Sequence, residues 1–287
     1  MVTRSRWILV LLAWGVSISA DAQLAIAASA PAPLVIGQTF TMESKLLKET
    51  RRINVYAPPP CEGDKAQACP VLYMPDGGMA EDFLHVAGLV QVSVGNATMR
   101  PFIVVGIENT ERRRDLTGPT EAAEDRKIAV HVGGSAAFRS FIRDELKPLI
   151  RSRYRVTDES AIVGESLAGL FIIETFFLEP DLFDSYIAIS PSLWWNQQAL
   201  ANTAMQRLDA MKLAHKALYL TSAGDDILAP IQMLDAALRD HAPANLNWTY
   251  APLPDEHHAT IYHPAALAAF RKMFAPPAPE PLPAPTH

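Results

Sequence analysis

Short apolar runs and longer amphipathic stretches alternate along this chain. The runs at residues 70–74 and 102–106 are each followed by a polar turn, which predicts strands buried on both faces. Two more strands are predicted at residues 185–190 and 217–222. Further strands are predicted at residues 39–44, 52–57, 161–163 and 246–253.

Between these strands, apolar residues recur at helical spacing. The clearest case begins at Ser135 and runs to about Ile150. Further helices are predicted at residues 167–178, 197–211, 230–241 and 264–274. Alternating strands and helices are typical of the α/β class, so we expect a mainly parallel central sheet with helices on both faces.

Both ends of the chain differ from this pattern. Arg4 and Arg6 precede the apolar residues 7–18, and small residues follow at 20–22, which predicts an export signal over residues 1–22. Cleavage as late as residue 30 and an uncleaved anchor are the alternatives. The apolar run is too short for an ordinary membrane span, so no stable span is expected after processing.

Length and charge limit the remaining possibilities. After the predicted signal over residues 1–22, a linker over residues 23–37, a catalytic-size domain over 38–274 and a Pro-rich disordered tail over 275–287 account for the rest of the 287 residues. The formal charge of -6 argues against a nucleic-acid partner, because phosphate binding needs clustered Lys and Arg. Because of the predicted export signal, the chain is expected to act in the periplasm or as a secreted protein. Its oligomeric state is open.

The two cysteines, Cys61 and Cys69, flank a short polar loop. In an exported chain this spacing predicts a disulfide, with two free thiols as the alternative. A zinc site is not expected, because two thiols without nearby ligands cannot complete a tetrahedral shell.

Candidate chemistry begins at GESLAG, residues 164–169, between a predicted strand and a predicted helix. A serine flanked by small residues at such a junction indicates a nucleophile elbow, with Ser166 as the nucleophile. Ala168 stands where glycine is usual. An ordinary turn is the alternative.

A serine nucleophile needs an imidazole to accept its proton and an acid to orient that imidazole. Three histidines follow the last predicted strand: His257, His258 and His263. The acid is expected after the preceding strand, where Asp226 is the first choice and Asp225 the second. Asp255, Glu256 or no acid at all are the remaining alternatives.

The oxyanion of an acyl-transfer reaction needs two backbone donors. The Leu167 amide, after the nucleophile, is one, and the Gly78 amide in the Asp-Gly-Gly turn is expected to be the other, unless this is a plain turn. Trp194 and Trp195 are predicted either to line a substrate cleft or to belong to the core. Arg112 and Arg114 either bind an anionic or iron-bound ester or lie in a solvated loop.

Several segments resemble a known family, the esterase branch of the α/β-hydrolases that includes siderophore (enterobactin-type) esterases and, more distantly, esterase D-like and mycolyltransferase proteins. The resemblance covers about residues 38–274. Its most discriminating segments are GIENTERRRDLT and SPSLWW, and RRINVYAPP, PVLYMPDGG, GESLAGLF and EHHATIYHPA add to it. It implies an α/β-hydrolase fold and selects His258, because the family has a histidine followed by two small residues at that place.

The sequence therefore predicts a serine esterase that acts through an acyl-enzyme on a small-molecule ester, with no metal and no organic cofactor. Two alternatives remain: an acyltransferase that uses a sugar or alcohol acceptor, and a hydrolase-fold protein that binds a ligand without cleaving it. The identity of the ester does not follow from the sequence.

Overall fold

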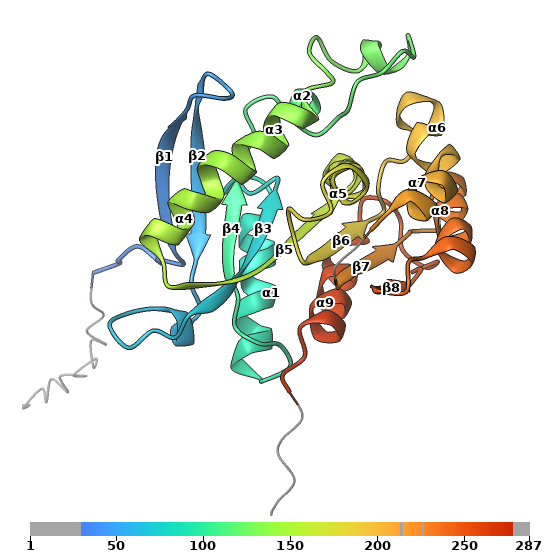
Figure 1. The fold of residues 1–287 in the computed structure, drawn as a ribbon. Helices are drawn as coiled ribbons and strands as arrows, with labels where there is room; N and C mark the ends of the chain where they lie inside the picture. Colours follow the sequence, from blue (N-terminus) through green and yellow to red (C-terminus); the bar gives the residue numbers. More distant parts are fainter. Residues whose placement is uncertain (1–29, 213–214, 225–226, 278–287) are drawn as a thin grey trace, which may run out of the picture. The chain divides into compact units, whose positions relative to one another are not determined.

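A computed structural model describes residues 30–212, 215–224 and 227–277 of the chain. Its strands are β1 (Gln38–Ser44), β2 (Glu49–Tyr56), β3 (Cys69–Pro75), β4 (Ile103–Ile107), β5 (Val156–Glu165), β6 (Ser185–Ile189), β7 (Lys216–Thr221) and β8 (Leu246–Tyr250). They form one eight-stranded sheet in the order β1-β2-β4-β3-β5-β6-β7-β8 (Figure 1). β2 pairs antiparallel with β1 and with β4, and the other neighbouring strands are parallel. The predicted mainly parallel sheet is confirmed.

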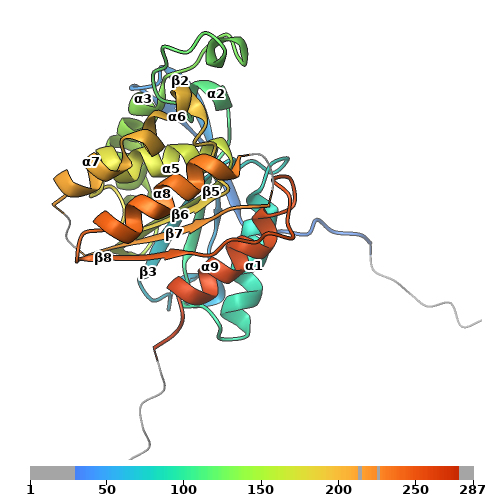
Figure 2. The ribbon, with the colours of Figure 1, turned by 90° about the vertical axis from the view of Figure 1, so that its right-hand side faces the viewer.

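Helices cover both faces of this sheet. They are α1 (Phe83–Gly95), α2 (Arg112–Asp115), α3 (Ser135–Phe141), α4 (Lys147–Arg153), α5 (Leu167–Leu178), α6 (Trp195–Asn202), α7 (Ala204–Ala210), α8 (Leu228–His241) and α9 (Tyr262–Met273). Figure 2 shows α1 and α9 together on one side of the sheet, with α5, α7 and α8 on the other. A π-helical stretch, Ile142–Leu146, joins α3 to α4.

The central strands are buried on both sides, as their apolar sequences predict. In β3, Val71 and Tyr73 belong to the hydrophobic cluster under α3, α5 and α8, and the alternate residues Leu72 and Met74 belong to the cluster under α1 and α9. Because successive side chains of a strand point to opposite faces, an uninterrupted apolar run fits a strand between two helical layers.

Two of the longer helical segments differ from the prediction, and the short α2 was not predicted. The single helix predicted over residues 197–211 is two helices, α6 and α7. Helix α1 is absent from the prediction, because its sequence holds four valines and two glycines, which are poor helix formers. Phe83, Val86 and Val90 of this helix are buried in the cluster shared with α9, so tertiary packing outweighs local propensity.

The predicted disulfide is confirmed: Cys61, which ends a short 3-10 helix (Pro59–Cys61), is bonded to Cys69, the first residue of β3. The bond fastens the β2–β3 connection to the amino edge of the sheet.

The predicted export signal, residues 1–22, lies outside the described residues, as do residues 23–29 of the linker and residues 278–287 of the tail. All of the elements named above fall between Gln38 and Met273. None of the helices in the described residues is both long enough and apolar enough to span a membrane.

Candidate active site

Polar side chains gather where the parallel strands end. Asp76 directly follows β3, Ser166 follows β5 and Ser190 follows β6, while His258 lies in the segment between β8 and α9. Parallel strands bring their carboxyl ends to the same edge of a sheet, and this edge is where open α/β folds place their sites.

Ser166 occupies a strained turn between β5 and α5. Its backbone has φ 62° and ψ -120°, a conformation that costs roughly 1–3 kcal/mol for a residue other than glycine. A Cβ on Gly164 would lie 2.5 Å from the Cβ of Ala168, so this bend requires glycine at residue 164 and tolerates alanine at 168. The geometry is that of a nucleophile elbow, which presents the serine hydroxyl above the end of the sheet.

The imidazole of His258 lies against this hydroxyl. Its Nε2 is 3.0 Å from Ser166 Oγ, and its Nδ1 is 3.0 Å from Ser190 Oγ. In the tautomer that leaves Nε2 free to accept the serine proton, Nδ1–H donates to Ser190. Ser166 and His258 are 92 positions apart in the sequence, yet their side chains lie within the distance that proton transfer requires.

The third member of the predicted triad is not placed. Asp226 and its alternative Asp225 both lie outside the described residues, so their role stays a prediction. Of the other candidates, Glu256 accepts a hydrogen bond from the Thr260 hydroxyl at 2.6 Å, and Asp255 is exposed.

Two further groups surround the reacting atoms, and sequence reasoning did not identify them. Glu165 Oε1 is 3.2 Å from His258 Nε2, so this nitrogen lies between a carboxylate and the serine hydroxyl. Ser192 Oγ is 3.3 Å from Ser166 Oγ. Glu165 is the variable position of GESLAG and Ser192 belongs to SPSLWW, so both lay within segments already singled out.

The two expected oxyanion donors differ in their surroundings. Leu167 begins α5, where backbone N–H groups have no helical carbonyl to bind. The Gly78 N–H donates to Glu81 Oε2 at 2.7 Å, and Glu81 Oε1 also accepts from Asn109 Nδ2 at 2.9 Å. Gly78 can therefore hold an oxyanion only if the Glu81 carboxylate moves aside, and its role stays a prediction.

Arg112 reaches the same edge of the sheet as a paired cation. Its guanidinium binds both carboxylate oxygens of Asp76, with Nε–Oδ1 2.6 Å and Nη2–Oδ2 2.8 Å. Burial favours the neutral form of Arg112, but the bond to Asp76 and the charges of Asp76 and Glu165 outweigh it and raise its pKa. The side chain is 35% exposed, so a ligand can still reach it.

Arg114 has a structural setting instead. Its guanidinium binds Glu49 of β2 and Asp115 of α2, and Arg51, which is fully buried, binds the same two carboxylates. Burial of Glu49 is outweighed by hydrogen bonds from Arg114, Arg51 and Thr110, which lower the pKa of Glu49 to about 2. This network joins α2 to the edge of the sheet, and substrate binding by Arg114 stays a prediction.

The two tryptophans, Trp194 and Trp195, also differ in burial. Trp195 is buried, and its indole N–H donates to the Gly118 carbonyl at 2.9 Å, so the core alternative holds for this residue. Trp194 is only partly buried and packs against Trp195 at an edge-to-face angle. Trp194 is thus the member of the pair that a ligand can contact.

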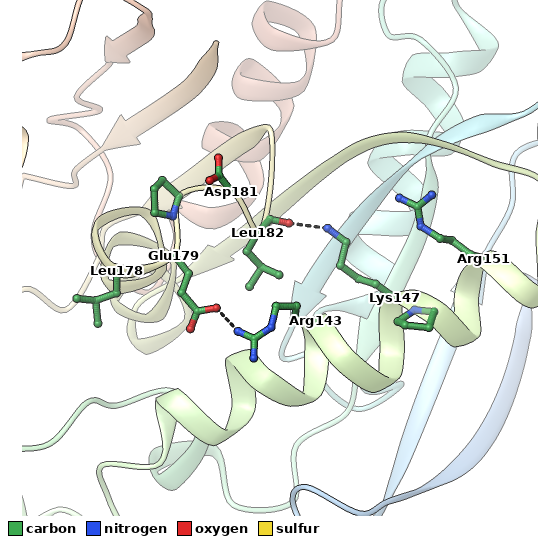
Figure 3. A pocket seen from close by; sticks show the side chains of 9 residues that line it. Arg143, Lys147, Arg151, Leu178, Glu179, Asp181 and Leu182 are labelled. Atoms are coloured by element: carbon green, nitrogen blue, oxygen red, sulfur yellow. Dashed lines mark hydrogen bonds and ion pairs between the residues drawn. The ribbon is translucent and has the colours of Figure 1, made fainter. Parts of the chain in front are cut away.

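A pocket of about 500 Å³ lies away from this site. Figure 3 shows Arg143 pointing to Glu179 and Lys147 pointing to the Leu182 carbonyl across it. Lys147 also donates to Ser160 Oγ in β5, and the six residue steps from Ser160 to Ser166, just past the end of β5, span roughly 20 Å. In the described part of the chain, no three His, Cys, Asp or Glu side chains gather closely enough to bind a metal ion.

The sequence matches the model of a family described as "Putative esterase" over residues 44–258. It is 31% identical over 170 residues to the ferri-bacillibactin esterase BesA of Bacillus subtilis. The matched region covers 52% of this chain and 56% of BesA. It is 35% identical over 108 residues to the siderophore triacetylfusarinine C esterase of Aspergillus fumigatus. Here the matched region covers 36% of this chain and 35% of that protein. The matches thus span about half or less of these relatives.

The fold resembles that of an IroE-like serine hydrolase from Shewanella oneidensis. The TM-score is 0.75 and the identity 27%, over 83% of this chain and 80% of the other.

Proposed function

The chain belongs to the esterase family that its sequence matches over residues 44–258, and from this premise we propose that it is a serine hydrolase that cleaves carboxylic esters. The observation that carries the proposal is the 3.0 Å approach of His258 Nε2 to the hydroxyl of Ser166, a residue held at positive φ at the end of a parallel strand. A strained backbone persists at a site of chemistry because the surrounding structure holds it there.

The proposed reaction has two stages. Ser166 Oγ attacks the ester carbonyl carbon while His258 Nε2 takes the hydroxyl proton, and the resulting oxyanion is held by the amides of Leu167 and Gly78. The imidazolium then gives that proton to the departing alcohol oxygen, which leaves Ser166 acylated. Water, deprotonated by the same imidazole, attacks the acyl-enzyme and releases the carboxylic acid.

The substrate class is proposed from the relatives. BesA and the Aspergillus fumigatus protein are named as esterases of siderophores, and we infer that this chain acts on esters of comparable size. Transfer of the acyl group to a sugar or alcohol is the alternative within the same chemistry, and binding without cleavage is the alternative outside it. The Cys61–Cys69 disulfide supports the proposal that the protein works outside the cytoplasm.

A labelling experiment tests this assignment directly. A fluorophosphonate probe forms a covalent bond only with an activated serine, so the wild type and a Ser152→Ala control, changed at an exposed residue of α4, should be labelled. Ser166→Ala should not be labelled and should lose turnover of nitrophenyl and trilactone esters by about a million-fold. Unlabelled wild-type protein would favour ligand binding without cleavage, and acyl transfer would appear as a new ester when an alcohol is added.

A further inference from the structure

Three consecutive residues in the first turn of α6 have left-handed backbone conformations. They are Asn196, Gln197 and Gln198, with φ of 49°, 52° and 62°, and they directly follow Trp194 and Trp195. A residue with a side chain is disfavoured in this conformation, because its Cβ lies too close to the following carbonyl oxygen. Such a backbone persists only where the surrounding structure holds it. The contacts of residues 196–198 therefore show what holds the tryptophan segment in place.

The carboxylate of Asp125 holds the first residue of this left-handed turn. Its Oδ2 accepts the backbone N–H of Asn196 at 2.8 Å and the hydroxyl of Thr120 at 2.5 Å. Asn196 Oδ1 in turn accepts the backbone N–H of Glu121 at 3.2 Å. Asp125 is only 5% exposed, so solvent competes little for these hydrogen bonds. The turn is thus fastened to a segment about 70 residues earlier in the chain.

Asp125 belongs to the long connection between α2 and α3, and we call residues 119–132 of this connection the strap. Figure 1 shows the strap beside α6, on the side of the molecule toward which the arrows of β3 and β4 point. Ile128 and Val132 of the strap pack against the same hydrophobic cluster as Trp194. The strap is therefore docked at the carboxyl edge of the sheet, where Ser166 lies.

A chain of hydrogen bonds joins the strap and the left-handed turn to the nucleophile. The indole N–H of Trp195 donates to the carbonyl of Gly118, directly before the strap, at 2.9 Å. The backbone N–H of Trp195 donates to the Ser192 carbonyl at 3.2 Å, and the Ser192 N–H donates to the Ser166 carbonyl at 3.0 Å. Trp194 lies within this connected segment, between Ser192 and the turn that Asp125 holds.

Resting on the proposed function, we propose that Asp125 is a positioning residue for substrate selection. Through Asn196 it holds Trp194 in place as one wall of the substrate site, against which the larger part of a bulky ester packs. Without the carboxylate, residues 196–198 relax toward the favoured right-handed conformation and Trp194 is displaced. Ser166 is held by its own elbow, so the defect is in the binding of bulky esters and appears in KM.

Three esters that differ in bulk test the proposal. Nitrophenyl acetate is the small ester, nitrophenyl phenylpropanoate enlarges the acyl portion, and naphthyl acetate enlarges the alcohol portion. Asp125→Ala should raise KM for at least one bulky ester by about tenfold relative to KM for the small ester, the effect of losing one charge-assisted hydrogen bond. Asp125→Asn keeps an oxygen acceptor and should restore most of this ratio. Glu124→Ala, at a neighbouring side chain that is 82% exposed, is the control.

Two further variants approach the same contact from the other side. Asn196→Pro removes the N–H that Asp125 binds, and proline cannot adopt a φ of 49°, so the same selective rise in KM is expected. Trp194→Ala should also raise KM selectively. Combining Asp125→Ala with Trp194→Ala should add little to the larger single effect, because both changes remove one wall.

Glycine tests the strain itself. Gln197→Gly with Gln198→Gly allows the left-handed conformation without the steric cost, so the turn depends less on the carboxylate. In the Asp125→Ala background this pair should bring the KM ratio part of the way back to the wild-type value. The thermal midpoint of each variant reports folding, and fluorophosphonate labelling reports the fraction of active enzyme.

An equal rise in KM for all three esters in Asp125→Ala would overturn this proposal and leave the proposed function standing. Fully additive effects of Asp125→Ala and Trp194→Ala would overturn it as well. Absence of turnover of every ester by the wild type, together with absence of fluorophosphonate labelling, would instead overturn the proposed function, and this proposal with it.

Discussion

The two edges of the sheet both carry charged side chains, and β5 runs between them, yet the side chains are arranged in opposite ways. At the carboxyl edge, His258 Nε2 lies 3.0 Å from Ser166 Oγ and 3.2 Å from Glu165 Oε1, so one nitrogen faces two groups. At the amino edge, Lys147 donates to Ser160 Oγ and to the Leu182 carbonyl, and no strained residue adjoins it. The ammonium of Lys147 therefore donates a separate hydrogen bond to each of two acceptors, whereas His258 Nε2 lies close to two groups at once.

This difference separates the proposed reacting site from the pocket and from the charged side chains at the amino edge. The 500 Å³ pocket belongs to the amino edge, where Arg143 is paired with Glu179 and Arg151 with Asp158. The carboxyl edge holds a residue at positive φ and an imidazole within reach of several partners. Strain and competing partners are features that folding alone does not favour, so they indicate function.

The largest effect expected at the carboxyl edge comes from the imidazole. His258→Ala should lower kcat for a nitrophenyl ester by about a million-fold, because Ser166 then has no group to accept its proton. The double variant with Ser166→Ala should be no slower than either single variant, because the two side chains act as one unit. His257→Ala is the matched control, and a comparable loss there would contradict the choice of His258.

The next largest effect separates two candidates for holding the imidazole. Asp226→Asn should lower kcat by roughly 10² to 10⁴-fold if Asp226 is the triad acid, because the wrong tautomer is then favoured. Ser190→Ala removes the 3.0 Å partner of Nδ1 and should cost less than about tenfold. Asp225→Asn is the control. The reverse order of these losses would assign the orienting role to Ser190.

At the amino edge the expected effect is on stability and not on catalysis. Burial lowers the pKa of Lys147 to about 8, with the charges of Arg151 and Lys216 adding to the effect and that of Asp184 opposing it. The unfolded chain, with the ordinary lysine pKa, therefore binds more protons between about pH 8 and 10.5, so stability rises with pH across that interval.

Lys147→Met should lose this rise. Measured by urea unfolding from pH 7.5 to 10.5, the wild type should gain up to roughly 3 kcal/mol relative to the variant. Lys127→Met, at a lysine that is 67% exposed, is the control. Parallel pH profiles for the wild type and Lys147→Met would contradict the expectation, as would a large loss of esterase activity in the variant.

The smallest of these effects concerns the disulfide, also at the amino edge. Replacing Cys61 and Cys69 by alanine should lower the free energy of unfolding by about 2 to 3 kcal/mol, the chain-entropy value for so short a loop. Reduction of the wild type with dithiothreitol should give a similar loss, while kcat/KM below the melting temperature stays within about twofold. A large fall in kcat/KM without a fall in stability would show that the two edges are coupled.

The local sequence pattern determined the central strands and the turn at Ser166. Apolar runs of strand length predicted the central strands, because a strand covered on both faces has no polar side to show. GESLAG predicted the elbow, because the steric demand of Ser166 at positive φ is met by neighbours within four residues, Gly164 and Ala168. Such features depend on contacts between residues close in sequence, so the sequence alone carries them.

Only the tertiary structure decided which distant groups meet. Helix α1 forms against the sheet and α9 despite its valines and glycines. Arg114 forms an ion pair with Glu49, 65 residues away, and its position in an arginine run does not predict this pairing. Sequence pattern and resemblance brought Ser166 and His258 together as candidates, but the approach of Glu165 to the same imidazole appears only in space. The physical reason is that burial, ion pairing and shared protons depend on distances across the fold, which no local pattern encodes.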